Sequence, residues 1–332
     1  MRLIQIQNGA MRAVAVVDEP RVRILDGAPS VLALAREAIE TRTGLVRLIE
    51  KKATRESLEY DPIYAGSSAW KLLPPFDHPD EPARCLVSGT GLTHLGSAKN
   101  RNAMHNASAN DVTDSMKMFR WGVEGGKPAA GKAGVAPEWF FKGAGTILRA
   151  HNDALPVPFY AEDGGEEAEV AGLYVIAPDG SPRRVGMAAG NEFSDHKFEK
   201  RNYLYLAGSK IRPCALGPEL VVDPAFQSVA GKTSIVRGGK EIWTKEIATG
   251  EAEMSHSLAN IEHHHFKFES HRRPGDAHVH FFGAHSLSFG DGIELADGDV
   301  MEVRWDGFGR GLRNPLRVAA RSDATVAVAS LA

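Results

Sequence analysis

Cysteine is almost absent from the sequence, since only Cys85 and Cys214 occur among 332 residues. So few cysteines argue against a disulfide framework and against a cysteine-based zinc site. A basic excess is also missing, because 39 lysine and arginine residues stand against 42 aspartate and glutamate residues. Proteins that bind nucleic acid usually need such an excess to neutralise phosphates, so we expect no nucleic-acid partner.

Long apolar runs are missing as well. No stretch reaches the roughly 18 apolar residues that a membrane-spanning helix needs, so we expect no membrane partner. Residues 1–7 become polar within a few positions and do not have the pattern of a signal peptide. Together with the scarcity of cysteine, this predicts a cytoplasmic protein.

The chain has enough apolar material for a buried core, with 43% hydrophobic and 24% charged residues. Residues 1–75 are predicted to form a small α+β N-terminal domain. Alternating apolar residues predict strands over 14–17 and 21–25, and helical spacing follows over 30–52. Ser30 is the predicted N-cap of the first helix.

A proline-dense linker, residues 72–82, leads into a larger unit at 84–332. Strand-like runs separated by Gly and Pro turns occur there at 85–87, 171–176, 220–222, 278–282 and 300–305. Helical patterns occupy 110–119 and 255–268. Because strands and helices do not alternate regularly, we predict a mostly β domain with a few covering helices rather than a doubly wound sheet.

Two acidic residues stand at the entrance of a predicted strand. Glu167 and Glu169 are two positions apart, so on a strand their side chains project to the same face and can converge. Carboxylates that converge need a cation between them, and hard oxygen ligands favour Mg²⁺, Mn²⁺ or Ca²⁺ over zinc. On spacing alone an acidic turn is an equal alternative, because Glu162, Asp163 and Glu166 lie alongside.

The segment 190–196 favours the metal interpretation. It supplies a third carboxylate, Glu192, on what is predicted to be the neighbouring strand. Lys210 follows, and after it a Cys-Ala-Leu-Gly-Pro turn at 214–218.

This order of motifs resembles the fumarylacetoacetate hydrolase superfamily. Further segments similar to that family lie at 137–143, 152–158, 282–290, 295–303 and 311–315. The resemblance covers about residues 84–318. It implies an α+β protein whose catalytic domain is a mixed β-sandwich or β-roll, preceded by a small α+β N-terminal domain, and it implies a homodimer.

The resemblance also assigns roles to residues. Glu167, Glu169 and Glu192 match the metal-binding acids, with Mg²⁺ as the expected cofactor, although Glu192 stands where the family usually has aspartate. Lys210 matches a lysine beside the metal and substrate, with a structural ion pair as the alternative. His94 falls at the family's catalytic histidine.

One family acid is missing, because Ser97 stands where many relatives have a glutamate three residues after the histidine. Glu124 is the candidate replacement within residues 100–132. Four further residues are predicted to bind substrate, with surface ion pairs as the alternative for the arginines and packing for the others: Arg101, Arg120, Tyr203 and Ser286.

Residues 94–105 and 118–128 are similar to the branch of the superfamily in bacterial sugar-acid catabolism. This implies Mg²⁺-dependent dehydration of a 2-keto-3-deoxy sugar acid, such as 2-keto-3-deoxy-L-arabinonate, to 2,5-dioxopentanoate through a metal-stabilised enolate. A hydrolase cleaving the C–C bond of a 2,4-diketo acid at the same site is the alternative. A third hypothesis is a non-enzymatic binding protein that keeps the fold.

The histidine triplet at 263–265 invites a metal interpretation, but consecutive helix residues point about 100° apart and cannot share one ion. The prediction for this triplet is a solvated helix face.

Overall fold

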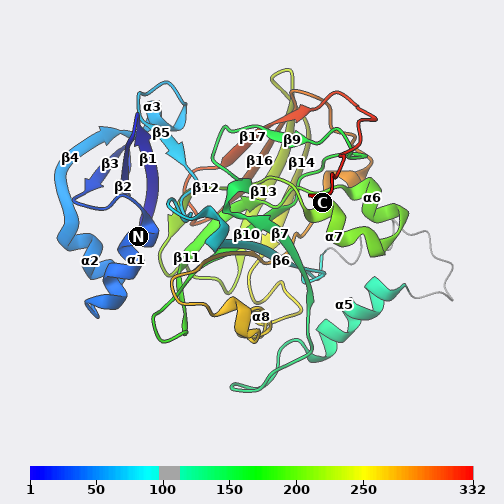
Figure 1. The fold of residues 1–332 in the computed structure, drawn as a ribbon, viewed down its shortest axis with the longest axis horizontal. Coiled ribbons are helices and arrows are strands. Elements are labelled where there is room, and N and C mark those ends of the chain that lie inside the picture. Colours follow the sequence, from blue (N-terminus) through cyan, green and yellow to red (C-terminus); the bar gives the residue numbers. More distant parts are fainter. Residues whose placement is uncertain (97–112, 332) are drawn as a thin grey trace.

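Two β-sheets make up most of the computed structural model, which describes residues 1–96 and 113–331 (Figure 1). In spatial order the larger sheet contains β4 (Ala53–Glu59), β3 (Arg21–Leu25), β2 (Met11–Asp18), β1 (Arg2–Asn8), β12 (Cys214–Val221), β11 (Pro182–Asn191), β10 (Ala168–Ile176), β15 (Ala277–Phe281), β6 (Cys85–Gly91) and β7 (Glu138–Ala144). Off this path, β5 (Lys71–Leu73) pairs with β1 and β8 (Leu148–Arg149) with β12. The smaller sheet contains β14 (Lys240–Thr249), β13 (Val229–Arg237), β16 (Val300–Trp305), β17 (Leu312–Val318) and β9 (Leu155–Val157). These two sheets, together with a small number of helices, confirm the predicted α+β class.

β10 lies at the centre of the core. All of its residues are buried, as its apolar sequence predicts for a strand covered on both faces. Leu173 and Val175 point into one hydrophobic cluster, whereas Val170 points into the second cluster, which lies against the smaller sheet. The start of β10, where the predicted metal acids stand, is therefore held on both sides.

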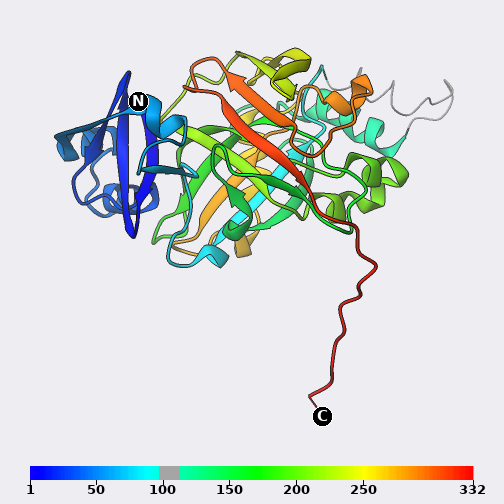
Figure 2. The ribbon, with the colours of Figure 1, turned by 90° about the horizontal axis from the view of Figure 1, so that it is seen from above.

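The N-terminal region contains β1 to β5 and the helices α1 (Val31–Glu40), α2 (Leu45–Lys52) and α3 (Tyr60–Tyr64). The Ser30 side chain accepts a hydrogen bond from the Ala33 amide at 3.1 Å, which confirms the predicted N-cap. Figure 2 shows this region at one end of the molecule. However, β1 pairs antiparallel with β12, so the larger sheet continues across the predicted linker. The division at residues 72–82 stays a prediction.

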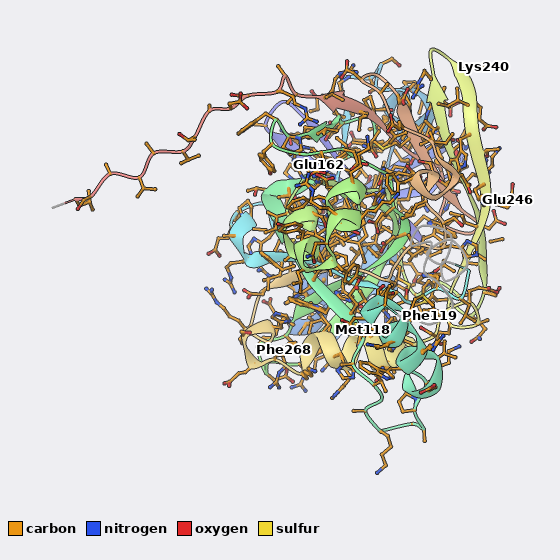
Figure 3. The ribbon with its side chains drawn as sticks, turned by 90° about the vertical axis from the view of Figure 1, so that its right-hand side faces the viewer. Met118, Phe119, Glu162, Lys240, Glu246 and Phe268 are labelled. Carbon is orange, nitrogen blue, oxygen red and sulfur yellow. The ribbon has the colours of Figure 1, made fainter. Side chains whose placement is uncertain are left out.

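Outside the N-terminal region, few helices surround the sheets in the part of the chain that the structure describes. They are α5 (Asp114–Gly125), α6 (His196–Arg201), α7 (Leu206–Lys210) and α8 (Leu258–Phe266), with short 3-10 turns at η1 (Pro82–Arg84), η2 (Gly145–Ile147), η3 (Tyr203–Tyr205), η4 (Glu269–His271) and η5 (Ser288–Asp291). Within the described ranges, none of the helices is long and apolar enough to cross a membrane. In Figure 3, Lys240 and Glu246 mark β14 at one edge of the smaller sheet, and the exposed residues after β17 extend away from the body.

The prediction of a solvated face for the histidine triplet is wrong for two of its members. His264 and His265 are only 9% and 1% exposed, and His263 alone faces solvent. α8 lies against the larger sheet, where Nε2 of His265 is 3.0 Å from Nδ1 of His278 on β15. The Trp139 indole donates to Nδ1 of His265 at 3.2 Å, so the sheet supplies the polar partners that let this helix bury histidine.

Candidate active site

Three acidic side chains meet where β10 begins and β11 ends. Glu167 immediately precedes β10, Glu169 lies on it, and Glu192 directly follows β11. The antiparallel register brings the strand ends together, and the Glu192 amide donates to the Glu167 carbonyl at 2.9 Å. All three side chains are buried, and one carboxylate oxygen from each lies within 4.8 Å of the others. The structure thus brings the three predicted metal ligands together.

The donor set fits a hard divalent cation such as Mg²⁺, because it consists of carboxylate oxygens. The surroundings of Glu169 give the strongest argument that this site binds a cation. Its Oε2 accepts a hydrogen bond from the Gly283 amide at 2.7 Å. Burial, together with the charges of Glu192 and Glu167, raises the pKa of Glu169 well above its usual value. A divalent cation between the three carboxylates would relieve this repulsion.

Lys210 neutralises the other two acids. Its Nζ lies 2.5 Å from Oε1 of Glu167 and 2.6 Å from Oε2 of Glu192, and 2.8 Å from the Ser194 hydroxyl. Burial by itself would lower the pKa of Lys210, but the charges of Glu167 and Glu192 outweigh it and hold that pKa well above its usual value. Lys210 is therefore a fixed ammonium beside the candidate metal position.

Lys142 is a second buried lysine, and its role is absent from the sequence predictions. It lies on β7, donates to Oε1 of Glu192, and also donates to the carbonyls of Phe193 at 3.0 Å and Lys210 at 2.9 Å. Its position directly after the apolar residues 139–141 of the same strand is the sequence signal that could have drawn attention to it.

His196, another residue missed from the sequence, contacts a metal-binding acid directly. Its Nε2 lies 3.2 Å from Oε1 of Glu167. Burial would lower the pKa of His196, but the hydrogen bond and charge of Glu167 raise it to about 9. The same contacts act in reverse on the acid: burial would raise the pKa of Glu167, and Lys210 and His196 hold it well below its usual value.

His94 follows β6 and is completely buried. Its Nδ1 lies 2.9 Å from the Thr93 hydroxyl, and its Nε2 lies 2.8 Å from the Thr249 hydroxyl. Burial, and then the nearby His285, lower the pKa of His94 to about 3, so the imidazole is neutral at physiological pH. Gly283, whose amide binds Glu169, packs so closely that a Cβ there would lie 3.3 Å from Nδ1 of His94. This close approach links His94 to the acids.

Glu138 is a buried acid on β7, the strand that also carries the buried Lys142. Between them, the Phe140 ring lies under Nζ of Lys210, 4.8 Å from its centre. Glu138 is 6% exposed, and its Oε2 accepts a hydrogen bond from the Tyr203 hydroxyl. The predicted substrate residue Tyr203 thus hydrogen-bonds to an acid that is not among the predicted site residues.

Solved structures resemble the chain along nearly its whole length. A 2-keto-3-deoxy-D-arabinonate dehydratase complexed with magnesium and 2,5-dioxopentanoate has 19% sequence identity and a TM-score of 0.71, with 97% of this chain and 100% of that chain covered. The chain has the fumarylacetoacetate hydrolase fold. A 5-carboxymethyl-2-hydroxymuconate delta-isomerase from Mycobacterium smegmatis has 17% identity and a TM-score of 0.56, with 96% and 100% covered. No family model matches the sequence, and no curated protein does.

The other predicted site residues take different places in this fumarylacetoacetate hydrolase fold. Ser286 is buried, with its hydroxyl 3.0 Å from Nδ1 of His285. Arg120 and Glu124 lie on α5 with exposed side chains, whereas the acid triad is buried. Arg101 lies outside the described residues. The substrate-binding and acid–base roles of these residues stay predictions.

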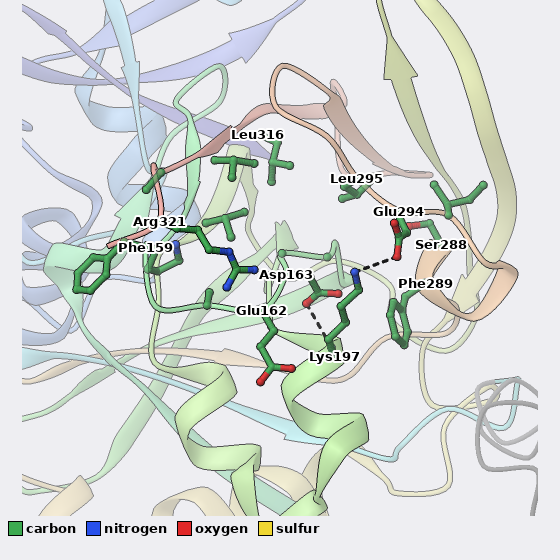
Figure 4. A pocket seen from close by; sticks show the side chains of 18 residues that line it. Phe159, Glu162, Asp163, Lys197, Ser288, Phe289, Glu294, Leu295, Leu316 and Arg321 are labelled. Atoms are coloured by element: carbon green, nitrogen blue, oxygen red, sulfur yellow. Dashed lines mark hydrogen bonds and ion pairs between the residues drawn. The ribbon is translucent and has the colours of Figure 1, made fainter. Parts of the chain in front are cut away.

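Glu166 is next to Glu167 in sequence, but its side chain holds a different segment of the fumarylacetoacetate hydrolase fold. Its two carboxylate oxygens accept hydrogen bonds from the Ser288 amide at 2.6 Å and the Ser288 hydroxyl at 2.7 Å, which anchors η5. A cavity of about 140 Å³ borders this segment, and Gly165, Lys197 and Phe289 line part of it. Figure 4 shows Lys197 inside this cavity, paired with Glu294 at 2.9 Å.

Proposed function

We propose that this protein is a Mg²⁺-dependent dehydratase, a carbon–oxygen lyase. It converts a 2-keto-3-deoxy sugar acid such as 2-keto-3-deoxy-L-arabinonate to 2,5-dioxopentanoate. The observation that carries the proposal is the buried triad of Glu167, Glu169 and Glu192 beside the ammonium group of Lys210. The fold supports it, because a protein of the same fold was solved with magnesium and 2,5-dioxopentanoate.

The three acids would hold Mg²⁺, which when bound supplies Lewis-acid polarisation of the substrate's 2-oxo group. Loss of water from C3 and C4 needs one group that takes the C3 proton and one that protonates the departing C4 hydroxyl. The resulting C3–C4 alkene is an isomer of 2,5-dioxopentanoate. Loss of a proton from C5 with return of a proton to C3 converts the C5 alcohol to an enol, which becomes the aldehyde as its hydroxyl proton is replaced by one at C4. His94 is suited to take the C3 proton, because its buried imidazole is neutral. Lys210 stays protonated and offsets the charge of two of the acids.

We assign the proton donor to Glu138. It is a buried carboxyl group on the strand that also supplies Lys142 and Phe140 to the site, and Tyr203 fixes its orientation. This assignment fills the gap left by Ser97, for which the sequence analysis selected Glu124. Glu124 is exposed on α5, whereas Glu138 is buried, and this difference favours Glu138 as the proton donor.

Glu138→Gln is expected to lower kcat by about 10²- to 10⁴-fold, the range typical of a lost general acid. Mg²⁺ affinity should stay unchanged, because Glu138 is not one of the three acids that meet. Steady-state kinetics and calorimetric Mg²⁺ titration measure both quantities. Glu124→Gln is the matched control and should leave kcat unchanged. If Glu124→Gln were the inactive variant and Glu138→Gln the active one, the assignment would be reversed.

The proposed activity is tested by incubating the protein with 2-keto-3-deoxy-L-arabinonate or its D-epimer and Mg²⁺, with and without chelator. Any aldehyde formed is coupled to an NADP-linked aldehyde dehydrogenase. We expect aldehyde formation that the chelator abolishes. Chelator-resistant aldehyde would remove the metal from the proposal, and no aldehyde from either epimer would remove this substrate class.

C–C hydrolysis of a 2,4-diketo acid is the second candidate function. The neutral imidazole of His94 beside the triad is equally suited to activate water for that reaction. Pyruvate release from a 2,4-diketo acid, without aldehyde from the sugar acid, would favour it. The homodimer implied by the family resemblance also stays a proposal, which the molar mass in solution tests.

A further inference from the structure

His196 is placed where it can control the orientation of one candidate metal ligand. The ring is 4% exposed and lies at the start of α6, directly after the segment that supplies Glu192. Its Nε2 contacts Oε1 of Glu167 at 3.2 Å. The aromatic face packs against Phe289, with ring centres 5.4 Å apart. Because Phe289 lines the cavity shown in Figure 4, His196 connects a wall residue of that cavity to the acid triad.

The two oxygens of Glu167 have unequal surroundings. Oε1 receives both Nζ of Lys210 and Nε2 of His196. Among the residues that the structure describes, Oε2 receives no hydrogen bond. Two donors on one oxygen fix the rotation of the carboxylate about its last bond, because turning it would break both contacts. The second oxygen is then left for a cation.

The surrounding backbone holds His196 in position for its contact with Glu167. Gly165 exchanges two backbone hydrogen bonds with Ser194, at 2.9 and 3.0 Å. A Cβ on Gly165 would lie 2.3 Å from Nδ1 of His196, so only glycine allows the ring to come this close. The Asp195 carboxylate accepts hydrogen bonds from the Phe198 amide at 3.0 Å and from Arg212 at 3.1 Å, which holds the first turn of α6 in place.

We propose that His196 is a positioning residue for the metal site, which raises Mg²⁺ affinity by holding Oε1 of Glu167 and so turning Oε2 toward the cation. The inference rests on the proposed metal site and extends it to a residue beyond the three ligands. Groups that orient metal ligands typically contribute 10- to 100-fold to metal affinity. Lys210 shares the same oxygen, so loss of His196 should weaken the site rather than destroy it.

The test compares two substitutions in the full chain after removal of metal by a chelator. His196→Leu keeps bulk but removes the donor, and His196→Gln keeps an amide N–H that can reach Oε1. Calorimetric titration with MgCl₂ is expected to show a Kd about 10- to 100-fold higher for His196→Leu. The Kd of His196→Gln should stay within about threefold of wild type, well short of that loss. At saturating Mg²⁺ the kcat of His196→Leu should return close to wild type, which a general packing defect would not produce.

His151→Leu is the matched control. His151 is also a buried histidine, but it stacks on Tyr64 with ring centres 4.1 Å apart and contacts none of the triad. It should lose thermal stability and keep its Mg²⁺ affinity. If His196→Leu does not fold, His196→Asn replaces it, because its amide is too short to reach Oε1. Wild-type affinity in the variant that lacks the donor would overturn the inference and leave the proposed function standing. Failure of the wild-type protein to bind Mg²⁺ would overturn the proposed function and this inference together.

Discussion

Glu169→Gln is expected to abolish Mg²⁺ binding and to lower kcat/KM by about 10³-fold or more, since the catalytic cation is lost. Among the residues that the structure describes, Glu169 is the acid of the triad without a lysine ion pair, whereas Glu167 and Glu192 pair with buried lysines. Its negative charge is therefore the part of the site that most requires a cation. Replacing one carboxylate oxygen by an amide group removes that charge and places a hydrogen-bond donor at the metal position.

The same substitution should not harm the metal-free protein. A buried carboxylate that repels its neighbours destabilises the fold, and a neutral amide of the same shape relieves that repulsion. We expect Glu169→Gln to unfold in chelator at the same temperature as wild type or at a higher one. Isothermal titration and thermal unfolding measure the two effects. Glu162→Gln, on the adjacent loop, is the control and should change neither. Full turnover by Glu169→Gln would refute the metal site.

Acidification below about pH 6.5 is expected to unfold the protein steeply. Burial is the main cause that lowers the pKa values of five histidines, to about 3 for three of them and about 4 for the other two: His94, His278, His280, His151 and His256. In the unfolded chain these groups titrate near their ordinary pKa of about 6.5. Their contribution to stability is therefore complete above that pH and is lost as the pH falls toward the folded pKa values.

The expected size follows from linkage. Each histidine that is protonated only in the unfolded state lowers the free energy of unfolding by up to about 1.4 kcal/mol per pH unit. Five together give at most about 7 kcal/mol per unit, which the raised pKa of Glu169 offsets by at most about 1.4 kcal/mol per unit, against a typical total of about 5–15 kcal/mol. Urea unfolding followed by circular dichroism at pH 7.5, 6.5 and 5.5 measures the slope. Equal free energies of unfolding at pH 7.5 and 5.5 would show that these histidines are not buried as described. His280→Gln should reduce the slope of the free energy of unfolding against pH by up to about 1.4 kcal/mol per pH unit, the contribution of one histidine.

The sequence predicts the acid pair well because a strand repeats every two residues. The two-residue spacing predicts that Glu167 and Glu169 converge, as they do although Glu167 directly precedes β10, and the resemblance supplies Glu192 and Lys210. Their partners are harder to find. Lys142 approaches Glu192 from a strand 50 residues earlier in the chain, and no local pattern announces such a contact. Glu138 stayed hidden for the same reason, since its burial follows from the packing of β7 against neighbouring elements.

The histidine triplet shows the limit of reasoning from one helix. A helical repeat indicates which residues share a face, but it does not indicate what that face meets. His265 is buried because Trp139 and His278 on two strands offer it hydrogen bonds, and the strand of Trp139 is 126 residues away from His265 in sequence. The strands that were predicted each overlap a strand of the structure, because alternation is a local property, and 300–305 coincides with β16. Other strands, such as β13 and β14, have no counterpart among the predictions.

The pairing of β1 with β12 has a consequence for how the chain is made. Leu3 lies opposite Leu220, so β1 leaves the ribosome long before its neighbour β12 has been synthesised. β2 is available at once, because it follows β1 through a tight turn, but the other edge of β1 stays open over much of its length. An open strand edge can pair with any other nascent chain. Once β5 has paired with residues 5–7 of β1, only a short part of this edge stays open. That part includes Arg2 and Leu3, which later pair with β12.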